Sequence, residues 1–221
     1  MREVIDERLL TAASFVRLGS RAADIGADHA YLCIHLIRHG ICSEVIATDI
    51  RPGPIAIARG NITAAGLDSV ISVRNGDGLA PIADGEVDDI IIAGMGGETI
   101  ADIVEAAPWT KNGGMRLILQ PMSKPEELRR RMYLAGFAPV AERAARAGGR
   151  LYTVMAMEYD PLAAAALSER PAVWYYGLLD PQHLESRQFL EHQRNRLLRA
   201  AAAGRNGLRE MADSIEKRLN P

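Results

Sequence analysis

The chain has 221 residues, enough for one well-buried domain and for about fifty or sixty residues more in an accessory element. Its formal net charge of −2 gives no overall attraction to a polyanion, and its two cysteines, with no signal sequence before Leu9, argue against a secreted protein held by disulfides. No apolar run approaches the roughly eighteen residues that a membrane span needs, so we expect a cytoplasmic protein with no membrane partner.

The first predicted element is a helix that precedes the sheet. Its apolar positions, Ile5, Leu9, Ala12 and Val16, recur at the three- to four-residue spacing of one helix face. We therefore expect this helix to pack against the domain that follows it.

Between Arg21 and Glu158, short β-branched apolar runs alternate with helical patterns, which is typical of βαβ units around a mostly parallel sheet. Strands are predicted at residues 22–25, 45–48, 70–73, 87–92, 116–119, 137–140 and 151–157. Helices are predicted between them at residues 31–39, 54–65, 99–106 and 125–135. The fold class is therefore α/β, with a doubly wound, seven-stranded, mostly parallel sheet.

The last two predicted strands are joined by a short stretch rich in alanine, arginine and glycine. This stretch is too short for a crossover helix, so the two strands should form an antiparallel hairpin. By analogy between folds, such a hairpin distinguishes the methyltransferase form of the doubly wound fold, which is Rossmann-like, from the dinucleotide-binding form.

The composition changes after Asp160. Residues 163–166 and Pro171 indicate a linker, and two further helices are predicted at about residues 181–203 and 208–219. Apolar residues recur at heptad spacing in the first of these helices and at steps of three and four in the second, so the pair can close an apolar seam. The predicted domains are a ligand-binding domain at residues 1–160 and a helical hairpin at residues 161–221.

The end of the first predicted strand carries the first functional motif, with Asp24, Gly26 and Asp28 directly before a helix. In a parallel sheet this position places a ligand at the carboxyl edge of the strands. A dinucleotide site needs G-x-G-x-x-G, and only its first glycine is present. Asp28 stands in the approach, where it would repel a diphosphate and attract a ligand that carries an ammonium and a sulfonium group. The motif therefore favours S-adenosylmethionine over a nicotinamide dinucleotide.

Two more acidic residues follow the next predicted strands. Asp49 ends the second strand, about twenty residues beyond the first motif, where a carboxylate can accept hydrogen bonds from ribose hydroxyls. Asp77 lies in a tight turn after the third strand, where it can accept from an adenine amino group. A turn residue of this type on its own more often serves the turn itself. Asp24, Asp49 and Asp77 at three successive strand ends instead outline one nucleoside-shaped site.

A glycine-rich loop at residues 93–97 follows the fourth predicted strand, at the same edge of the sheet. Such a loop permits the close approach of a flat group and leaves backbone N–H groups free. The competing interpretation is a phosphate-binding loop, but the lysine and the serine or threonine that complete such a loop are missing.

In order and spacing, these motifs resemble those of the bacterial tRNA (adenine(22)-N1)-methyltransferase family. The resemblance is carried by residues 24–32, 76–79, 93–97 and 117–121, and it extends to Arg8-Leu9 and to the C-terminal helical pair. The histidine after Asp28 and the Gly-Met-Gly-Gly run are its most specific parts. Two positions depart from the family pattern, because Asp49 stands where a glutamate is expected and Met122 stands where an asparagine is expected.

The resemblance implies methyl transfer from S-adenosylmethionine to N1 of an adenine in tRNA. The predicted cofactor-binding residues are Asp24, Gly26, Asp28, Asp49, Ile50, Asp77, Gly78 and Ala93. The predicted pocket for an extruded target base comprises Gly94, Met95, Gly96, Gln120 and Pro121. We expect tRNA contacts from Arg8, Arg194 and Arg199, and a monomer or a weak homodimer.

The candidate catalytic residues are Asp28 and His29. Adenine N1 carries a lone pair and no proton, so catalysis should come from positioning and a preorganised pocket, without a proton-abstracting side chain. Asp28 can hold the positive charge that passes from sulfur to the base. His29 either orients the ligand or the base, or it caps the helix as a structural residue.

Other interpretations of the sequence stay open or are disfavoured. A set of histidines and cysteines lies within one short segment, at residues 29, 33, 35, 39 and 42, but its spacing closes no four-ligand zinc site, and we predict no metal. A methyltransferase that acts on a small molecule or a protein remains possible, with the tail as a dimerisation hairpin. An inert ligand-binding domain whose tail recruits a partner is the other alternative.

Overall fold

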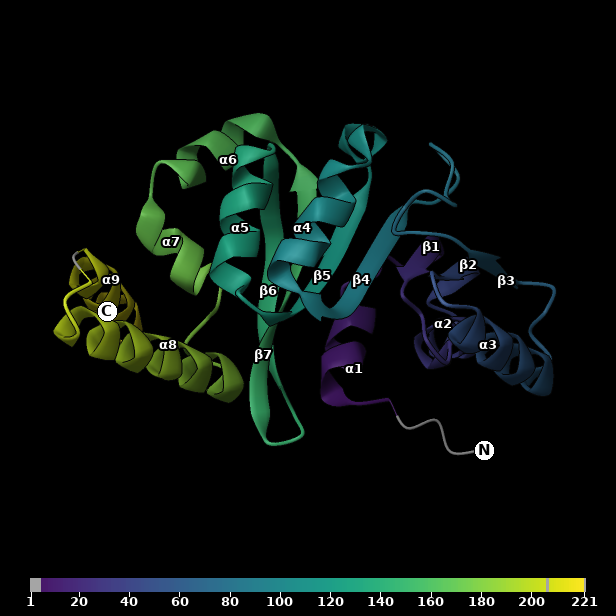
Figure 1. Cartoon of the computed structure of the whole chain (residues 1–221), viewed down its shortest axis with the longest axis horizontal. Coiled ribbons are helices and arrows are strands. Elements are labelled where there is room, and N and C mark those ends of the chain that lie inside the picture. The colour runs from purple at the N-terminus through teal and green to yellow at the C-terminus, as the bar shows by residue number, and fades with distance from the viewer. Residues whose placement is uncertain (1–4, 206, 221) are drawn as a thin grey trace.

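The centre of the protein is a seven-stranded sheet with the strand order β3-β2-β1-β4-β5-β7-β6, seen in a computed structural model that describes residues 5–205 and 207–220 (Figure 1). The strands are β1 (Ser20–Ile25), β2 (Cys42–Asp49), β3 (Ile71–Asn75), β4 (Asp89–Gly96), β5 (Arg116–Ser123), β6 (Phe137–Ala147) and β7 (Arg150–Tyr159). β1 to β5 run parallel, and β7 pairs antiparallel with both β5 and β6. The predicted fold class and the closing hairpin are therefore confirmed.

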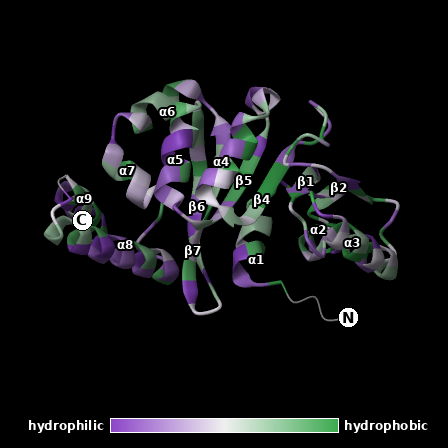
Figure 2. Ribbon diagram, viewed as in Figure 1, coloured by the Kyte–Doolittle hydropathy of each residue, from purple (hydrophilic) through white to green (hydrophobic). Residues whose placement is uncertain are grey.

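Helices cover both faces of the sheet. α1 (Glu7–Ala13), α2 (Tyr31–Arg38) and α3 (Pro52–Ala65) pack on one face, and α4 (Gly97–Glu105) and α5 (Pro125–Leu134) pack on the other. The middle of β4 is apolar on both sides, because Ile91 joins the first face and Ile90 and Ile92 join the second. Figure 2 shows this as green central strands between helices of mixed colour. A short 3-10 helix, η1 (Pro108–Lys111), leads into β5.

The boundaries of α1 and β4 differ from those predicted. α1 is shorter than the apolar spacing suggests, because the Asp6 carboxylate accepts from the N–H groups of Arg8 and Leu9 and so starts the helix after Ile5. Val16 is buried beyond the end of the helix. β4 begins at Asp89 and runs through the glycine-rich loop, with irregular register against β5 between Ala93 and Gly96.

The hairpin of β6 and β7 is longer than predicted and extends past the carboxyl end of β5. β7 pairs with β5 from Glu158 to Met155 and then continues only with β6, toward a turn at Gly148 and Gly149. This extension protrudes between α1 and helix α8 (Leu184–Ala202) (Figure 1). Its side chains alternate, so one face meets α1 and the other meets α8.

The predicted linker after Asp160 is wrong, because this stretch is helical. α6 (Pro161–Ser168) and α7 (Pro171–Tyr176) fill it. The Asp160 carboxylate accepts from the N–H groups of Leu162 at 3.1 Å and Ala163 at 3.0 Å, and a proline occupies the first turn of each helix. The alanine-rich composition that suggested a linker is therefore that of a capped helix.

The C-terminal helical pair is confirmed, as α8 and α9 (Leu208–Leu219). A small apolar cluster joins them and includes Leu190, Leu197, Ile215 and Leu219. A fully buried ion pair between Arg129 of α5 and Glu142 of β6 holds the segment that leads into this helical pair. Around it, Arg129 donates to the carbonyl of Trp174 at 2.7 Å, and Glu142 accepts from the N–H group of Leu178 at 2.9 Å. Within residues 5–205 and 207–220, no helix is both long enough and apolar enough to cross a membrane.

Candidate active site

A cavity of about 500 Å³ opens at the carboxyl ends of β1, β2 and β4, where the sequence predicts the ligand. The predicted residues that line it are Arg8, Asp24, Gly26, Asp28, His29, Asp49, Ile50, Asp77, Gly78, Ala93, Gly94 and Met95. The structure thus brings together all the predicted cofactor-binding residues, although their individual contacts with a ligand stay predictions. The lining also includes Tyr31, Thr48, Arg51 and Thr99, which the sequence did not single out.

The loop between β1 and α2 has an unusual backbone. Gly26, Asp28 and Ala30 have φ angles of +75°, +50° and +58°, so every second residue is left-handed. Gly26 lies so close to Met95 that an added Cβ would collide with the Met95 Cε. Left-handed conformations at Asp28 and Ala30 cost roughly 1 kcal/mol or more each, and backbone strain of this kind gathers at binding sites. Only the surrounding fold keeps this loop in a shape that faces the cavity.

Asp24 is the most buried carboxyl group of the cavity, with 5% of the residue exposed. Burial raises its pKa to about 6, and a hydrogen bond donated by the Cys33 thiol at 3.3 Å partly opposes this shift. Burial and the neighbouring Asp24 raise the pKa of Cys33 well above its usual value. Cys33 is therefore a protonated donor to Asp24 as well as a small core residue.

Asp49 is buried at the end of β2 and has a basic neighbour. Its carboxylate accepts from the backbone N–H of Arg51 at 2.9 Å and from the Arg51 Nε at 3.4 Å. The Arg51 guanidinium also lies 3.9 Å from an Asp28 oxygen. An arginine two residues after a strand-end acid was the signal that could have identified this neighbour in the sequence.

One polar atom of the cavity wall has no partner. The hydroxyl of Thr48 is buried and makes no hydrogen bond within the part of the chain that the structure describes. Buried polar groups are nearly always paired, so this enclosed hydroxyl would gain from a polar partner in the adjoining cavity.

His29 does not occupy the helix-cap position, because Ala30 is the residue that precedes α2. Its ring stacks on Tyr31, with the centroids 5.6 Å apart and the planes 8° from parallel. Its Nε2 lies 3.4 Å from an Asp28 oxygen, and its carbonyl accepts from Asn61. These contacts place the imidazole beside Asp28 at the rim of the cavity.

The residues predicted for the target-base pocket fall into two groups. Gly94 and Met95 line the cavity, whereas Gly96, Gln120 and Pro121 do not. Gln120 is fully buried behind Gly94, and its side-chain oxygen accepts from the Gly94 N–H at 3.1 Å. This placement argues against direct contact between Gln120 and a base.

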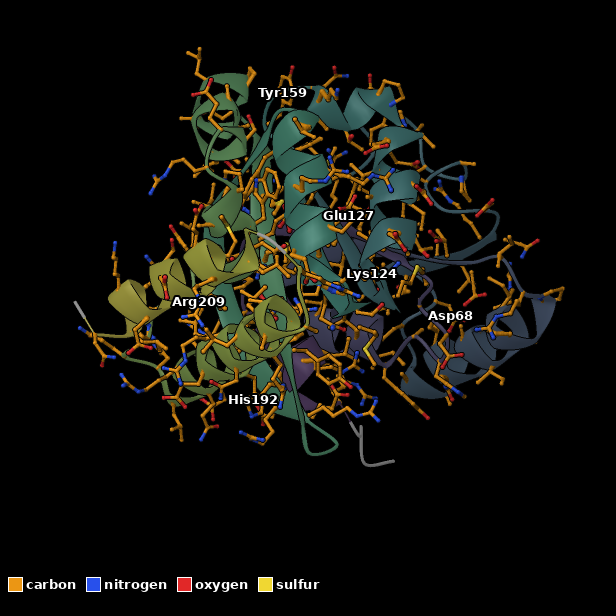
Figure 3. All side chains as sticks on the ribbon, turned by 60° about the vertical axis from the view of Figure 1, so that its left-hand side comes forward. Asp68, Lys124, Glu127, Tyr159, His192 and Arg209 are labelled. Atoms are coloured by element: carbon orange, nitrogen blue, oxygen red, sulfur yellow. The ribbon has the colours of Figure 1, made fainter. Side chains whose placement is uncertain are left out.

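The arginines predicted to contact tRNA lie in three different environments. Arg8 lines the cavity, and Arg194 is paired with Glu216 of α9. Arg199 lines a second cavity of about 590 Å³ between α5, β7 and α8, together with Arg196 and His192. Figure 3 shows side chains projecting outward along α8 and α9, with His192 labelled on α8.

The histidines and cysteines of the disfavoured metal site are not gathered around one point. Cys33 and Cys42 are buried in the core, while His29 faces the cavity. Across residues 5–205 and 207–220, no group of three or more histidine, cysteine, aspartate or glutamate residues is placed to hold a metal ion.

Comparisons with known proteins agree with this geometry. Residues 5–155 match the model of the family described as "Methyltransferase domain". The tRNA (adenine(22)-N(1))-methyltransferase of Bacillus subtilis (strain 168) is 40% identical over 161 residues, which are 73% of this chain and 68% of that protein.

Solved structures extend the similarity over nearly the whole chain. The B. subtilis m1A22 tRNA methyltransferase TrmK is 33% identical with a TM-score of 0.79, covering 99% of this chain and 97% of that one. Sp1610 of Streptococcus pneumoniae, in its complex with S-adenosyl-L-methionine, is 32% identical with a TM-score of 0.83, covering 96% of this chain and 98% of that one.

Proposed function

Because the chain belongs to the tRNA (adenine(22)-N1)-methyltransferase family, we propose that it transfers a methyl group from S-adenosylmethionine to N1 of adenine 22 in tRNA. The observation that carries this proposal is the convergence of Asp24, Asp49 and Asp77, from three neighbouring strand ends, on one cavity. Two similar proteins support it. The B. subtilis protein is named a tRNA (adenine(22)-N(1))-methyltransferase, and the S. pneumoniae structure holds S-adenosyl-L-methionine.

The residues of the cavity fit S-adenosylmethionine. Asp24 is a buried carboxyl with a raised pKa, and a cation beside it would favour the ionised form. Thr48 offers an unpaired hydroxyl, and we assign Asp49 to the ribose hydroxyls and Asp77 to the adenine amino group. Ile50, together with the small residues Gly26, Gly78 and Ala93, completes the walls around the ligand.

S-adenosylmethionine supplies an electrophilic methyl group, and the adenine N1 lone pair forms the new bond as the sulfur–carbon bond breaks. The chain therefore needs to hold the base in line and exclude water, and no side chain has to remove a proton. Asp28, at the rim of the cavity, offsets the positive charge that the base acquires. His29 orients the Asp28 carboxylate, since its Nε2 lies 3.4 Å from a carboxylate oxygen.

The tRNA backbone is proposed to lie across the β6–β7 extension toward the cavity that Arg199 lines. Arg143 and Arg150 on the extension are exposed, as is Arg199. Phosphate contacts need exposed cations that are not already neutralised. Arg194 meets this condition less well, because Glu216 pairs with it.

We propose a cytoplasmic enzyme that works as a monomer or a weak homodimer. Light scattering of the purified protein with and without tRNA tests this, and a tight dimer at nanomolar concentration would contradict it.

The direct test of the function uses the full chain, S-adenosylmethionine and an unmodified tRNA transcript with adenine at position 22. We expect 1-methyladenosine at that position, identified by mass and retention of the nucleoside. A transcript with guanine at position 22 is the control and should not be methylated. Methylation on N6, or of small molecules only, would refute the assignment.

A further inference from the structure

Arg8 is held in place by groups of the protein itself. Its Nε and Nη2 donate to the Asp6 carboxylate at 2.9 and 2.8 Å, and its Nη1 donates to the Gln120 side-chain oxygen at 2.6 Å. Nη1 also lies 3.3 Å from the Met122 sulfur, and the guanidinium carbon is 5.7 Å from the centre of the Tyr152 ring. Only 16% of the side chain is exposed. Most of its five N–H groups are therefore directed at the protein and away from solvent.

Gln120 connects Arg8 to the glycine-rich loop. The same side-chain oxygen that accepts from Arg8 accepts from the Gly94 N–H at 3.1 Å. The side-chain amide donates to the carbonyl of Pro121 at 2.8 Å, which fixes the orientation of the group. Arg8 and Gly94 are thus joined through one buried oxygen.

The loop needs such support at this point. The pairing of β4 with β5 shifts register between Ala93 and Met95 and again before Gly96, so the sheet ladder does not hold the backbone in a regular way. Gly94 has a φ of +83°, and Gly94 and Met95 both line the cavity. An added Cβ on Gly94 would lie in ordinary van der Waals contact with the Arg8 Nη1, at 3.9 Å.

We propose that Arg8 is a positioning residue for methyl transfer, which acts through Gln120 to fix the Gly94–Met95 backbone against the target base. This inference rests on the proposed function, and it replaces the expected role of Arg8 as a phosphate contact. Arg8 and Asp6 together carry no net charge, so their pair does not oppose the positive charge that develops on the base.

Arg8→Lys separates positioning from phosphate binding. Lysine keeps the charge but cannot reach Asp6, Gln120 and Met122 at once, because it lacks the planar fork of arginine. We expect kcat to fall about 10- to 100-fold, since small displacements of a site have effects of this size, with the KM for tRNA nearly unchanged. Arg8→Met should leave the salt dependence of tRNA binding at the wild-type slope. An unchanged kcat in Arg8→Lys would overturn the inference. A raised KM for tRNA or a flatter salt slope would show instead that Arg8 contacts phosphate.

A matched control is Arg17→Lys. Arg17 also lies near the N-terminus and donates from its Nε to a buried carboxylate, that of Asp89 at 2.7 Å, but at the opposite edge of the sheet. This variant should lower the melting temperature and leave kcat unchanged. If it slowed catalysis as much as Arg8→Lys, both effects would reflect general destabilisation, and the inference would be wrong.

The double variant Arg8→Lys, Gln120→Leu tests whether Arg8 acts through Gln120. If Arg8 acts through Gln120, the double variant should be no more than about threefold slower than the slower single variant. Independent roles would multiply the two losses. Multiplied losses would overturn the inference.

Hydrogen exchange measures the link without reference to catalysis. The Gly94 amide should exchange at least about tenfold faster in Arg8→Lys and in Gln120→Leu than in the wild type, because its acceptor is displaced or absent. Unchanged exchange would overturn the link. If the wild-type chain methylates no tRNA, the proposed function fails, and this measurement still decides whether Arg8 positions the loop.

Discussion

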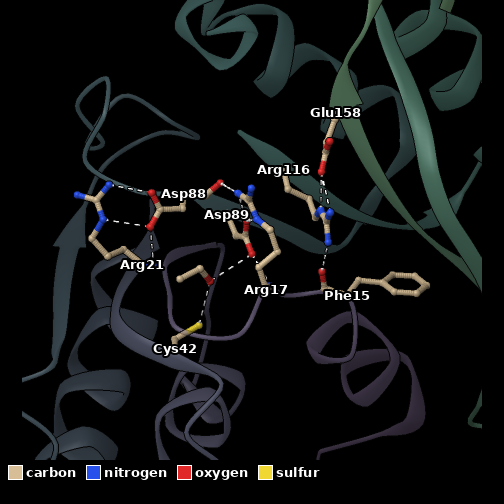
Figure 4. A network of polar contacts seen from close by, with 9 residues as sticks. Phe15, Arg17, Arg21, Cys42, Asp88, Asp89, Arg116 and Glu158 are labelled. Carbon is tan, nitrogen blue, oxygen red and sulfur yellow. Dashed lines mark hydrogen bonds and ion pairs between the residues drawn. The ribbon is translucent and has the colours of Figure 1, made fainter. Parts of the chain in front are cut away.

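Acidic residues lie at both ends of the parallel strands, which form the amino edge and the carboxyl edge of the sheet, but their surroundings differ. At the amino edge, Asp88 accepts from the Arg21 side chain at 2.9 and 3.1 Å, and this arginine holds the pKa of Asp88 down at about 2 (Figure 4). Beside it, the buried Asp89 accepts from the backbone N–H and the side chain of Arg17. Arg116 binds Glu158 in the same network.

At the carboxyl edge, the acids have weaker or no basic partners. Asp24 has only the Cys33 thiol as a side-chain partner within the described residues, and burial moves its pKa upward to about 6. Arg51 is a distant basic neighbour of two other acids, because its Nε lies 3.4 Å from Asp49 and its guanidinium lies 3.9 Å from Asp28, at the outer limit of an ion pair. The acids of one edge are satisfied by the fold, whereas those of the other edge are available to a ligand.

This difference separates structural from functional carboxylates by their partners and not by their type. A buried carboxylate with no cationic neighbour destabilises the fold, so its presence beside a cavity calls for a ligand that compensates it. An arginine-paired carboxylate at the other edge needs nothing further.

The largest effect is expected from Asp89→Ala. It leaves the Arg17 N–H and guanidinium without their acceptor and should lower the free energy of unfolding by about 3 kcal/mol. Urea denaturation measures the loss. Binding of S-adenosylmethionine to the folded variant should match the wild type, and a large loss of affinity there would break the separation of the two edges.

Asp49→Ala is the complementary change at the carboxyl edge. Loss of the charged acceptor proposed for two ribose hydroxyls should weaken S-adenosylmethionine binding by about 2 kcal/mol, or roughly thirtyfold. Calorimetry measures the affinity. The free energy of unfolding of the ligand-free protein should change little, and the opposite pattern, with stability lost and affinity kept, would assign Asp49 to the structural set.

The pH dependence of binding reports on Asp24. Because its pKa is about 6, only roughly a tenth of the molecules carry the carboxylate one pH unit lower, so affinity for a cationic ligand should fall about tenfold between pH 7 and pH 5. Asp24→Asn should bind more weakly at neutral pH and show a flatter profile. A wild-type profile that is already flat would mean that Asp24 does not face the ligand's charge.

Stability of the ligand-free protein should depend on Asp24 with the opposite sign. Its pKa is raised from 3.8 to about 6 on folding, so between these values the folded protein keeps a proton that the unfolded chain has released. The free energy of unfolding should therefore fall as pH rises through this window and level off above it. Denaturation of wild type and Asp24→Asn at several pH values measures this contribution as the difference between the two slopes.

The succession of strands along the chain and the acids at their ends could be predicted from the sequence, because apolar runs and turn residues are local signals. The helices α6 and α7 could not be separated from a linker by composition alone, since alanine and proline are compatible with both. The cap at Asp160, followed by proline, was the overlooked signal.

The residues behind the cavity wall are held by contacts between residues that are far apart in the sequence. Arg8 and Gln120 are 112 positions apart, and nothing local indicates that they share a hydrogen bond or that Gln120 is buried. The sequence therefore placed both residues in direct contact with tRNA or base. Residues that act through a neighbour look the same in a sequence as residues that touch the substrate.

The contrast between paired and unpaired charges also separates two arginines of α8, where the smallest effects are expected. Arg194 is paired with Glu216, whereas Arg199 is exposed and makes no ion pair within the described residues. Arg199→Ala should weaken tRNA binding about threefold and reduce the slope of log K against log salt by about 1, as expected for one lost phosphate contact. Arg194→Ala should change both less, because its charge is already offset. Filter binding at several salt concentrations gives both quantities, and equal effects of the two variants would mean that Glu216 releases Arg194 when tRNA binds.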